Sequence, residues 1–488
     1  MRQVSGFHST SHGRGATLNV VEIQFRKNIV CEYSQADSSS SPASAAASDK
    51  WWFTSPRQHN RPDTQSIDFP TLVFLDPGLL RHGQVEIERA APPVPAHILR
   101  LLGDMNEVRG IAARFFEHIH RWMPFISKIR FYELHLQPTF SSQSNVVLLL
   151  LSLKLITTIP PAESQSPRSA LYSTVKHFQL EVEASGALSI QVLQAGVLIS
   201  LYELGHGIYP AAFLTIGACA RYAYALGISV SRTVYTKKVL ALVEAEERRR
   251  VWWAIVILDR FVSIGCPGRP FATADPQLDD ILPADDNAWD QGIVRPDDLF
   301  TLSSPLAGHM SKFALLCQAA RLLGQVLHHA SSETTVDDDA WVQLDRTLQS
   351  MLAAALDLDN PDHDQIAFVY SAFIALHTMW LSPDGATTPN TDRAQRARAV
   401  IQQITDQIRV NLVERQCFAG RDPEDMSPWG LFFAYRICVA HTRSAQESAN
   451  LSEVVERIKE TILAIHARWN VAGVYLQLLE AQEVATRF

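Results

Sequence analysis

Apolar residues recur at helical spacing along much of the chain, and this periodicity is the feature that most limits its fold. One face of a helix is formed by Ile190, Leu193, Val197, Leu198, Leu201 and Leu204. Two later stripes are Val400, Ile401, Ile404, Ile408 and Leu412, and then Leu451, Val455, Ile458, Ile462, Ile465 and Trp469. No succession of alternating strand patterns accompanies them. The sequence therefore predicts an all-α fold, a multi-helical regulatory domain with a disordered N-terminal segment.

Proline and glycine suggest where two of the helices begin and end. Pro210 suits the first helical position, where a missing N–H costs nothing, and Gly227 suits the C-terminal end. A third helix is predicted over about 244–263, with acidic residues in its first turn, where the helix dipole favours them.

The N-terminal part has a different composition. Residues 35–48 are a low-complexity run of Ser and Ala, and prolines punctuate the chain as far as Pro95. We predict three parts: an N-terminal remnant at 1–34, a Ser/Pro-rich linker at 35–95 and an all-helical domain at 96–488.

Charge and cysteine usage narrow the class of protein. The 488 residues carry 43 basic and 51 acidic side chains, whereas a dedicated nucleic-acid-binding domain usually has a basic excess. The six cysteines include no C-x-x-C pair, which indicates free thiols in a reducing compartment. The chain has no signal-peptide pattern, and its most apolar run, 146–159, is short for a bilayer span and contains Lys154. We expect a soluble, intracellular protein without membrane contact.

No catalytic constellation emerges from the motifs. His118 and His120 are two residues apart, so on a helix they point in different directions and cannot share a metal ion. Aspartates are frequent between Asp275 and Asp298, but prolines interrupt that segment, so the carboxylates do not repeat along a helical face. We predict a solvated loop there, no catalytic residue and no metal site; an all-α enzyme with a magnesium site is the weakest alternative.

The most distinctive segment is 244–270, EAEERRRVWWAIVILDRFVSIGCPGRP. The pairs Glu244–Arg248 and Glu246–Arg250 have the favoured i,i+4 orientation, and the apolar run after them indicates a core helix rather than a DNA-reading one. Asp259 ends that run and needs a cation such as Arg260 or Arg269. We predict a structural clamp in which Arg269 returns to the helix end near Asp259.

These residues resemble the signature of the fungal-specific transcription factor domain, the middle homology region of the zinc binuclear cluster regulators. The matching positions are Arg221, Ala223, Leu226, Gly227, Glu247, Arg248, Arg249, Arg250, Trp252, Trp253, Asp259, Arg260, Gly268, Arg269, Pro270, Leu282 and Pro283. The segment 115–125, FFEHIHRWMPF, resembles the opening of that domain, so the signature core covers about 111–286. The chain departs from many members in having Ile228 and Ser229 where a histidine usually follows the L-G pair.

The resemblance implies an α-helical regulatory domain of a nuclear transcription regulator, not an enzyme. Members normally bind DNA through a separate module in which six cysteines hold two zinc ions. Only Cys31 precedes the linker, and it resembles the last ligand of such a cluster. One thiolate cannot organise a binuclear site, so the resemblance implies no cofactor in this chain and zinc only with a fuller N-terminus.

Two explanations of the missing ligands stay open. We expect that the sequence lacks an upstream part; the alternative is a co-regulator or effector-sensing protein without a DNA reader of its own. The expected partners are promoter DNA in the first case, transcriptional co-regulators in both, and a second copy of the chain as a homodimer. The leading hypothesis is regulation of a metabolic gene set, including a secondary-metabolite biosynthetic cluster, on family habit alone.

A ligand site, if present, is expected among the regulatory helices. Tyr202, His206 and Tyr209 lie near a helix end marked by Gly205 and Gly207. Helix termination explains these residues better than ligand binding does.

Overall fold

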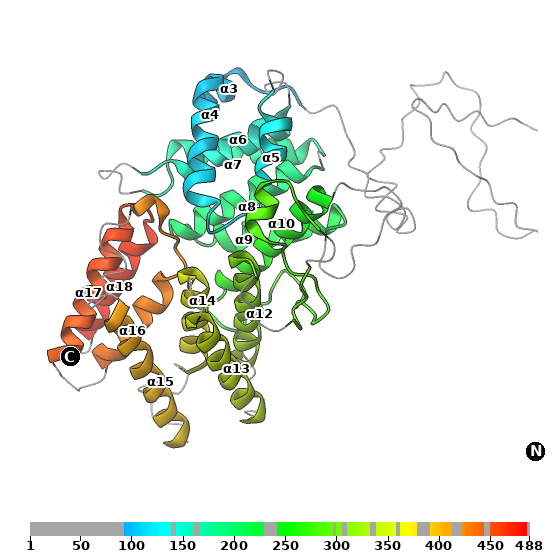
Figure 1. Cartoon of the computed structure of the whole chain (residues 1–488). Helices are drawn as coiled ribbons and strands as arrows, with labels where there is room; N and C mark the ends of the chain where they lie inside the picture. The colour runs from blue at the N-terminus through cyan, green and yellow to red at the C-terminus, as the bar shows by residue number, and fades with distance from the viewer. Residues whose placement is uncertain are drawn as a thin grey trace, which may run out of the picture. The chain divides into compact units, whose positions relative to one another are not determined.

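The computed structural model describes residues 92–137, 143–160, 166–186, 188–228, 242–295, 299–304, 310–331, 338–357, 362–377, 391–411, 422–443 and 449–485. These residues form α-helices and short helical turns, with no β-strand among them apart from an isolated bridge between Ile281 and Thr301. The predicted all-α class is confirmed (Figure 1). The predicted parts 1–34 and 35–91, with Cys31 and the linker, lie outside the described residues, and the first described helix begins at Ala96.

The helices follow one another along the chain as α3 (Ala96–Leu102), α4 (Met105–Arg114), α5 (Lys128–Arg130), α6 (Ser144–Thr157), α7 (Ala170–Ala184), α8 (Ile190–Gly205), α9 (Ala211–Ala225), α10 (Leu242–Phe261), α11 (Asp286–Asp290), α12 (Lys312–Ser331), α13 (Asp338–Leu356), α14 (His363–His377), α15 (Thr391–Arg409), α16 (Leu431–Arg443), α17 (Ala449–His466) and α18 (Val471–Ala485). Shorter turns are η1 (Phe115–Ile119), η2 (Phe131–His135) and η7 (Pro423–Asp425).

The first half of the domain is built around two helices that are apolar on every side. Nearly all residues of α6 and α8 are buried, as expected for helices that are surrounded by others. These two helices pack on each other, α4 and α7 pack on α6, and α9 and α10 pack on α8. Lys154, the charge noted in the apolar run, donates from Nζ to the Leu101 carbonyl at 2.6 Å.

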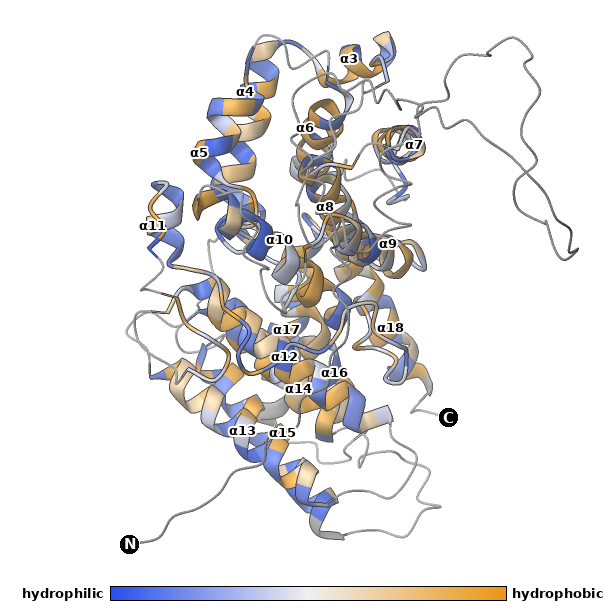
Figure 2. Cartoon of the chain, turned by 90° about the vertical axis from the view of Figure 1, so that its right-hand side faces the viewer, coloured by the Kyte–Doolittle hydropathy of each residue, from blue (hydrophilic) through white to orange (hydrophobic). Residues whose placement is uncertain are grey.

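The second half continues this packing from α10. Helix α12 contacts α10 and α14, α14 contacts α13 and α16, and α16 contacts both α17 and α18. Surface helix α15 shows one hydrophilic and one hydrophobic face (Figure 2). Its buried face contains Val400, Ile401, Ile404 and Ile408, which confirms that stripe; Leu412 lies outside the described residues.

The predicted helix boundaries agree with the structure within about two residues. The helix over 190–204 is α8, and α9 has Pro210 as its N-cap and Gly227 just past its end, at a positive φ of 68°. A glycine is favoured there because side chains rarely adopt this conformation. Helix α10 covers 242–261, close to the predicted 244–263.

Candidate functional site: a buried charge network around helix α10

Helix α10 takes its three consecutive arginines into the interior. The predicted pairs form: Arg248 contacts Glu244 at 3.2 Å, and Arg250 contacts Glu246 at 2.8 Å. Arg249 also contacts Glu246, which the i,i+4 argument missed because this pair is spaced i,i+3. The side chain of Arg249, the most exposed of the three, is only 15% exposed. The arginine run therefore serves packing, and it does not form a basic surface for DNA.

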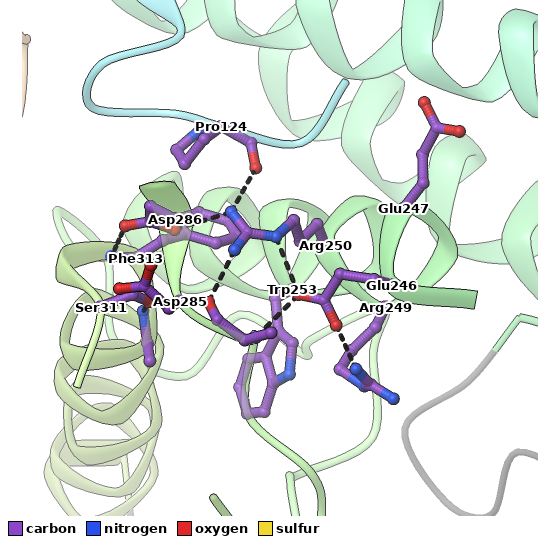
Figure 3. A network of polar contacts seen from close by, with 12 residues as sticks. Pro124, Glu246, Glu247, Arg249, Arg250, Trp253, Asp285, Asp286, Ser311 and Phe313 are labelled. Atoms are coloured by element: carbon purple, nitrogen blue, oxygen red, sulfur yellow. Dashed lines mark hydrogen bonds and ion pairs between the residues drawn. The ribbon is translucent and has the colours of Figure 1, made fainter. Parts of the chain in front are cut away.

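Arg250 is the centre of this network and is fully buried (Figure 3). Beyond Glu246, its guanidinium donates to Asp286 at 2.7 Å and to the carbonyls of Pro124 and Ala284 at 3.1 and 2.7 Å. It also lies 4.0 Å from the centre of the Trp289 ring, in cation–π geometry. One side chain thus joins α10 to the loop after η1 and to the segment around α11.

Glu247 makes a second connection from the same helix. Its carboxylate accepts the Ser127 N–H at 2.9 Å, the Arg130 Nε at 2.9 Å and the Gln194 amide at 2.9 Å. Burial raises the pKa of Glu247, although these donors and the Arg130 charge oppose the shift. The residue that the resemblance placed beside the arginines therefore ties α5 and α8 to α10.

The two tryptophans of the signature are core residues with different neighbours. Trp253 is fully buried and its indole N–H donates to the Ile281 carbonyl at 3.0 Å. The ring of Trp252 packs edge-on against Tyr224 of α9, with 5.1 Å between the ring centres. Pro283 is buried in the loop that Trp253 holds, so these motifs, distant in the sequence, meet on α10.

The clamp at the end of α10 exists, but its cation is Arg260. Asp259 accepts from Arg260 at 2.9 Å, and from the Thr273 N–H and hydroxyl at 2.9 and 2.7 Å. Arg260 is buried, bonds Asp275 at 3.0 Å, and lies 3.9 Å from the centre of the Phe271 ring. Arg269 is exposed and lies over the Phe213 ring, so the predicted return of Arg269 to Asp259 is wrong. The loop returns to Asp259 through the N–H groups of 272 and 273, which the charge argument ignored.

The acidic segment is a connected loop and not a solvated one, which corrects the prediction. Asp285 caps α11 by accepting the Ala288 N–H at 2.8 Å, Asp286 pairs with Arg250, and Asp290 contacts His120 at 2.8 Å. Asp297 and Asp298 lie outside the described residues. The prolines prevent a helical carboxylate array, as argued, but the basic partners come from distant parts of the chain that spacing does not reveal.

The remaining signature residues are not part of this network. Arg221 is exposed on α9, and Pro270 is exposed beside Arg269. Gly268 has a positive φ of 96°, which supports the predicted turn between α10 and the returning loop.

The histidine candidates have separate partners. His118 contacts Asp425 at 2.9 Å, whereas His120 contacts Asp290, so the two side chains do not converge. Within the described ranges, no group of three or more His, Cys, Asp or Glu side chains is placed to hold a metal ion. Cys219, Cys317 and Cys438 are buried free thiols and Cys266 is an exposed one. The described part therefore does not fit a binuclear zinc cluster.

The third candidate group, near the end of α8, packs against the C-terminal helices. His206 is 1% exposed and lies between the rings of Tyr202 and Trp469, at 4.1 and 5.6 Å between centres. Tyr202 donates to the Pro167 carbonyl at 3.1 Å, and Tyr209 is exposed. These contacts account for Tyr202 and His206 as packing residues at a helix end.

Sequence reasoning missed the C-terminal partners of this core. Arg468 is 2% exposed and donates to the Ile156 carbonyl, while Trp469 donates to the Met426 carbonyl at 2.7 Å. Trp122 packs edge-on against both Trp429 and Trp469. The apolar periodicity of α17 includes Trp469, but nothing in the sequence pairs it with 122 or 156.

An all-helical domain whose charged signature is spent on internal bonds is typical of a regulatory module. The sequence profile described as "Fungal specific transcription factor domain" matches residues 112–366, more than half of the chain. The chain belongs to the fungal-specific transcription factor domain family, and the match extends beyond the predicted signature core.

Relatives of known kind agree with this membership. The chain is 36% identical over 156 residues to "Transcription factor BOA15" of Botryotinia fuckeliana (strain B05.10), covering 32% of this chain and 85% of that one. It is 23% identical over 422 residues to "Pigment biosynthesis transcriptional activator pigB" of Monascus ruber, covering 79% and 74% of the two chains. It is 31% identical over 119 residues to "Notoamide biosynthesis cluster transcriptional coactivator notQ'" of Aspergillus versicolor, covering 22% and 23%.

No solved structure matches the chain. Among the described residues, no helix combines the length and the apolar character that a membrane span requires.

Proposed function

We propose that this chain is a nuclear transcription regulator of a fungal metabolic gene set, and that the helical residues supply its regulatory domain. The observation that carries the proposal is the family match over 112–366, which contains α10 and its buried network. The proposal includes no catalytic role, since the motif-bearing side chains bond to one another inside the fold.

The kind of gene set is proposed from the relatives. One of them is a pigment biosynthesis activator and another belongs to a notoamide biosynthesis cluster. We extend this to a secondary-metabolite cluster as the target here. Nuclear localisation, promoter DNA and co-regulators as partners, and a homodimer belong to the same proposal.

Zinc enters the proposal only through residues outside the described ranges, with Cys31 as one ligand. The alternative is a co-regulator that joins transcription complexes without contacting DNA itself. The printed word "coactivator" for a 31% identical relative supports this second candidate. Both candidates use the helical domain in the same way.

The test is to delete the gene, restore it with an epitope tag, and measure transcripts and chromatin occupancy. We expect grouped metabolic genes to lose transcription on deletion and the tagged protein to occupy their promoters. Unchanged transcripts across growth conditions, or a tagged protein excluded from the nucleus, would contradict the proposal.

The two candidates differ in DNA binding by the isolated protein. We would map the 5′ end of the transcript, then measure zinc content and promoter binding of the purified protein. About two zinc ions per chain with sequence-specific binding identifies a DNA-binding regulator of the cluster type. Promoter occupancy in cells without DNA binding in solution identifies the co-regulator.

A further inference from the structure

A cavity of about 700 Å³ lies among the helices of the C-terminal half. Its described lining comes from α14, α16, α17 and the η7 segment. Sites for small molecules in proteins commonly have volumes of about 300–1,000 Å³. The cavity is therefore large enough for a small organic molecule, and it is separate from the α10 network.

The inner walls of the cavity are apolar. They contain Ile366, Ala367, Leu431, Ile458, Ile462 and Ile465, all of which are buried. Walls of this kind favour an apolar ligand, because its transfer from water removes apolar surface from the solvent.

One polar group in the wall lacks a partner. Tyr370 is 3% exposed, and its hydroxyl has no hydrogen-bond partner among the described residues. Its ring lies 5.4 Å from that of Phe433, another lining residue. Burial raises the pKa of Tyr370 to about 12, so the phenol is neutral and can donate or accept. A buried hydroxyl without a partner costs free energy, and a ligand oxygen would remove that cost.

The charged residues at the cavity do not select a charged ligand. The lining contains four carboxylates, those of Asp362, Asp364, Asp422 and Asp425, against the cations of Arg121 and Lys312. This acidic excess disfavours an anion. The carboxylates already accept hydrogen bonds from the protein, for example Asp422 from the Glu424 N–H at 2.9 Å and Asp362 from the Gln365 N–H at 3.2 Å, so no bare charge attracts a cation.

We infer that this cavity binds a neutral, largely apolar small molecule that carries a hydrogen-bonding oxygen, a hydroxyl or a carbonyl, recognised by the Tyr370 hydroxyl. The inference goes beyond the proposed function, since binding is measured on the purified protein whatever its target genes are.

The test uses the full chain and Nile red, a neutral apolar fluorophore with a carbonyl oxygen. We expect one saturable site with blue-shifted emission, and weaker binding of the anionic probe 8-anilinonaphthalene-1-sulfonate. Tyr370→Phe removes the hydroxyl and should weaken Nile red binding by about two- to tenfold, the usual range for one hydrogen bond. Ala434→Trp fills the cavity from α16 and should weaken binding by more than about tenfold.

Controls place the same changes elsewhere. Leu214→Trp adds an indole at a position that is 62% exposed on α9, and Tyr132→Phe removes a hydroxyl from a ring that is 40% exposed. Neither should alter Nile red binding. Thr461→Trp enters the cavity from α17 and replaces Ala434→Trp if thermal denaturation shows that the latter does not fold.

Two results would overturn the inference. Unchanged affinity in a folded cavity-filling variant means that the probe binds elsewhere. Unchanged affinity in Tyr370→Phe, with binding abolished by the tryptophan, means that the hydroxyl does not recognise the ligand oxygen.

Discussion

Two arginines are buried in different regions of this domain, and their surroundings are opposite. Arg250 in α10 is 0% exposed and contacts two carboxylates, those of Glu246 and Asp286. Arg468, between α17 and α18, is 2% exposed; it donates to the Ile156 carbonyl and lies 4.0 Å from the centre of the Trp469 ring. The α10 region neutralises its buried charge with carboxylates, whereas the C-terminal region uses a carbonyl dipole and an aromatic face.

The pKa of each guanidinium reflects this difference. Burial lowers the pKa of Arg250, but Asp286 and Glu246 more than compensate, so its pKa is raised. Burial lowers the pKa of Arg468 to about 10, with only a partial opposing contribution from Glu424. The difference teaches that a buried arginine of the signature is one member of a charge-balanced network. Removing one member leaves the others uncompensated, whereas removing Arg468 leaves no buried carboxylate behind.

The largest expected effect is that of Arg250→Met. The substitution leaves Glu246 and Asp286 without their shared cation, and losing one partner of a buried ion pair costs about 3–5 kcal/mol. Urea denaturation of the full chain measures this as a fall in midpoint. Arg248→Met is the matched control on the same helix, because its partner Glu244 is partly exposed, and it should cost about 1 kcal/mol or less. Equal losses in the two variants would remove the distinction.

Asp259→Ala should have the next largest effect. The carboxylate accepts hydrogen bonds from Arg260 and from the loop at 272 and 273, so its removal should cost about 3 kcal/mol. Asp275→Ala is the control, because that side chain is 59% exposed and Arg260 keeps Asp259. Differential scanning calorimetry of both variants checks the order. A melting temperature unchanged in Asp259→Ala would disprove the clamp.

How much of this network the sequence could predict follows from the separation of the partners. The pairs of Arg248 and Arg250 follow from helix geometry alone, because i and i+4 share a face. Asp286 and the Pro124 carbonyl, which lie 36 and 126 residues from Arg250, meet it only after packing. Arg468 and Ile156 are 312 residues apart. Periodicity therefore predicted the helices and the local pairs, while the acidic loop was taken as solvated since its cations are distant in sequence.

A pH effect is expected at the contact between α8 and the C-terminal helices. Burial and the charge of Arg468 lower the pKa of His206 to about 3, against its ordinary value of 6.5, although the N–H of Asn470 donates to its Nδ1. As the pH falls below 6.5 the unfolded chain binds a proton that the folded one does not. The free energy of unfolding should therefore fall by about 1.4 kcal/mol per pH unit from this group, down to about pH 3.

His206→Asn keeps an acceptor for the Asn470 N–H and removes the titration. Urea denaturation at pH 6.5, 6.0 and 5.5 should give a shallower decline in the variant, by one proton's worth of slope. An unaltered slope would show that His206 is not the group that titrates on unfolding.

A smaller effect is expected for Arg468→Met, the direct counterpart of Arg250→Met. Replacing an isolated buried charge by an apolar side chain of similar length removes a desolvation cost and loses one hydrogen bond to a carbonyl. These changes oppose each other, so the free energy of unfolding should stay within about 1 kcal/mol of the wild-type value. A loss as large as that of Arg250→Met in the same urea measurement would show that carboxylate contacts do not distinguish the two regions.

The smallest effect concerns the surface pair Arg114–Glu424, which joins α4 to η7 at 3.0 Å near both regions. The Arg114 side chain is 47% exposed, so water and salt screen the attraction, and such pairs contribute about 0.2–1 kcal/mol. A double-mutant cycle of Arg114→Ala and Glu424→Ala should give a coupling energy in that range, falling further in high salt. Coupling that is larger and insensitive to salt would mean that η7 holds its charge as tightly as α10 does, since only a desolvated pair escapes screening.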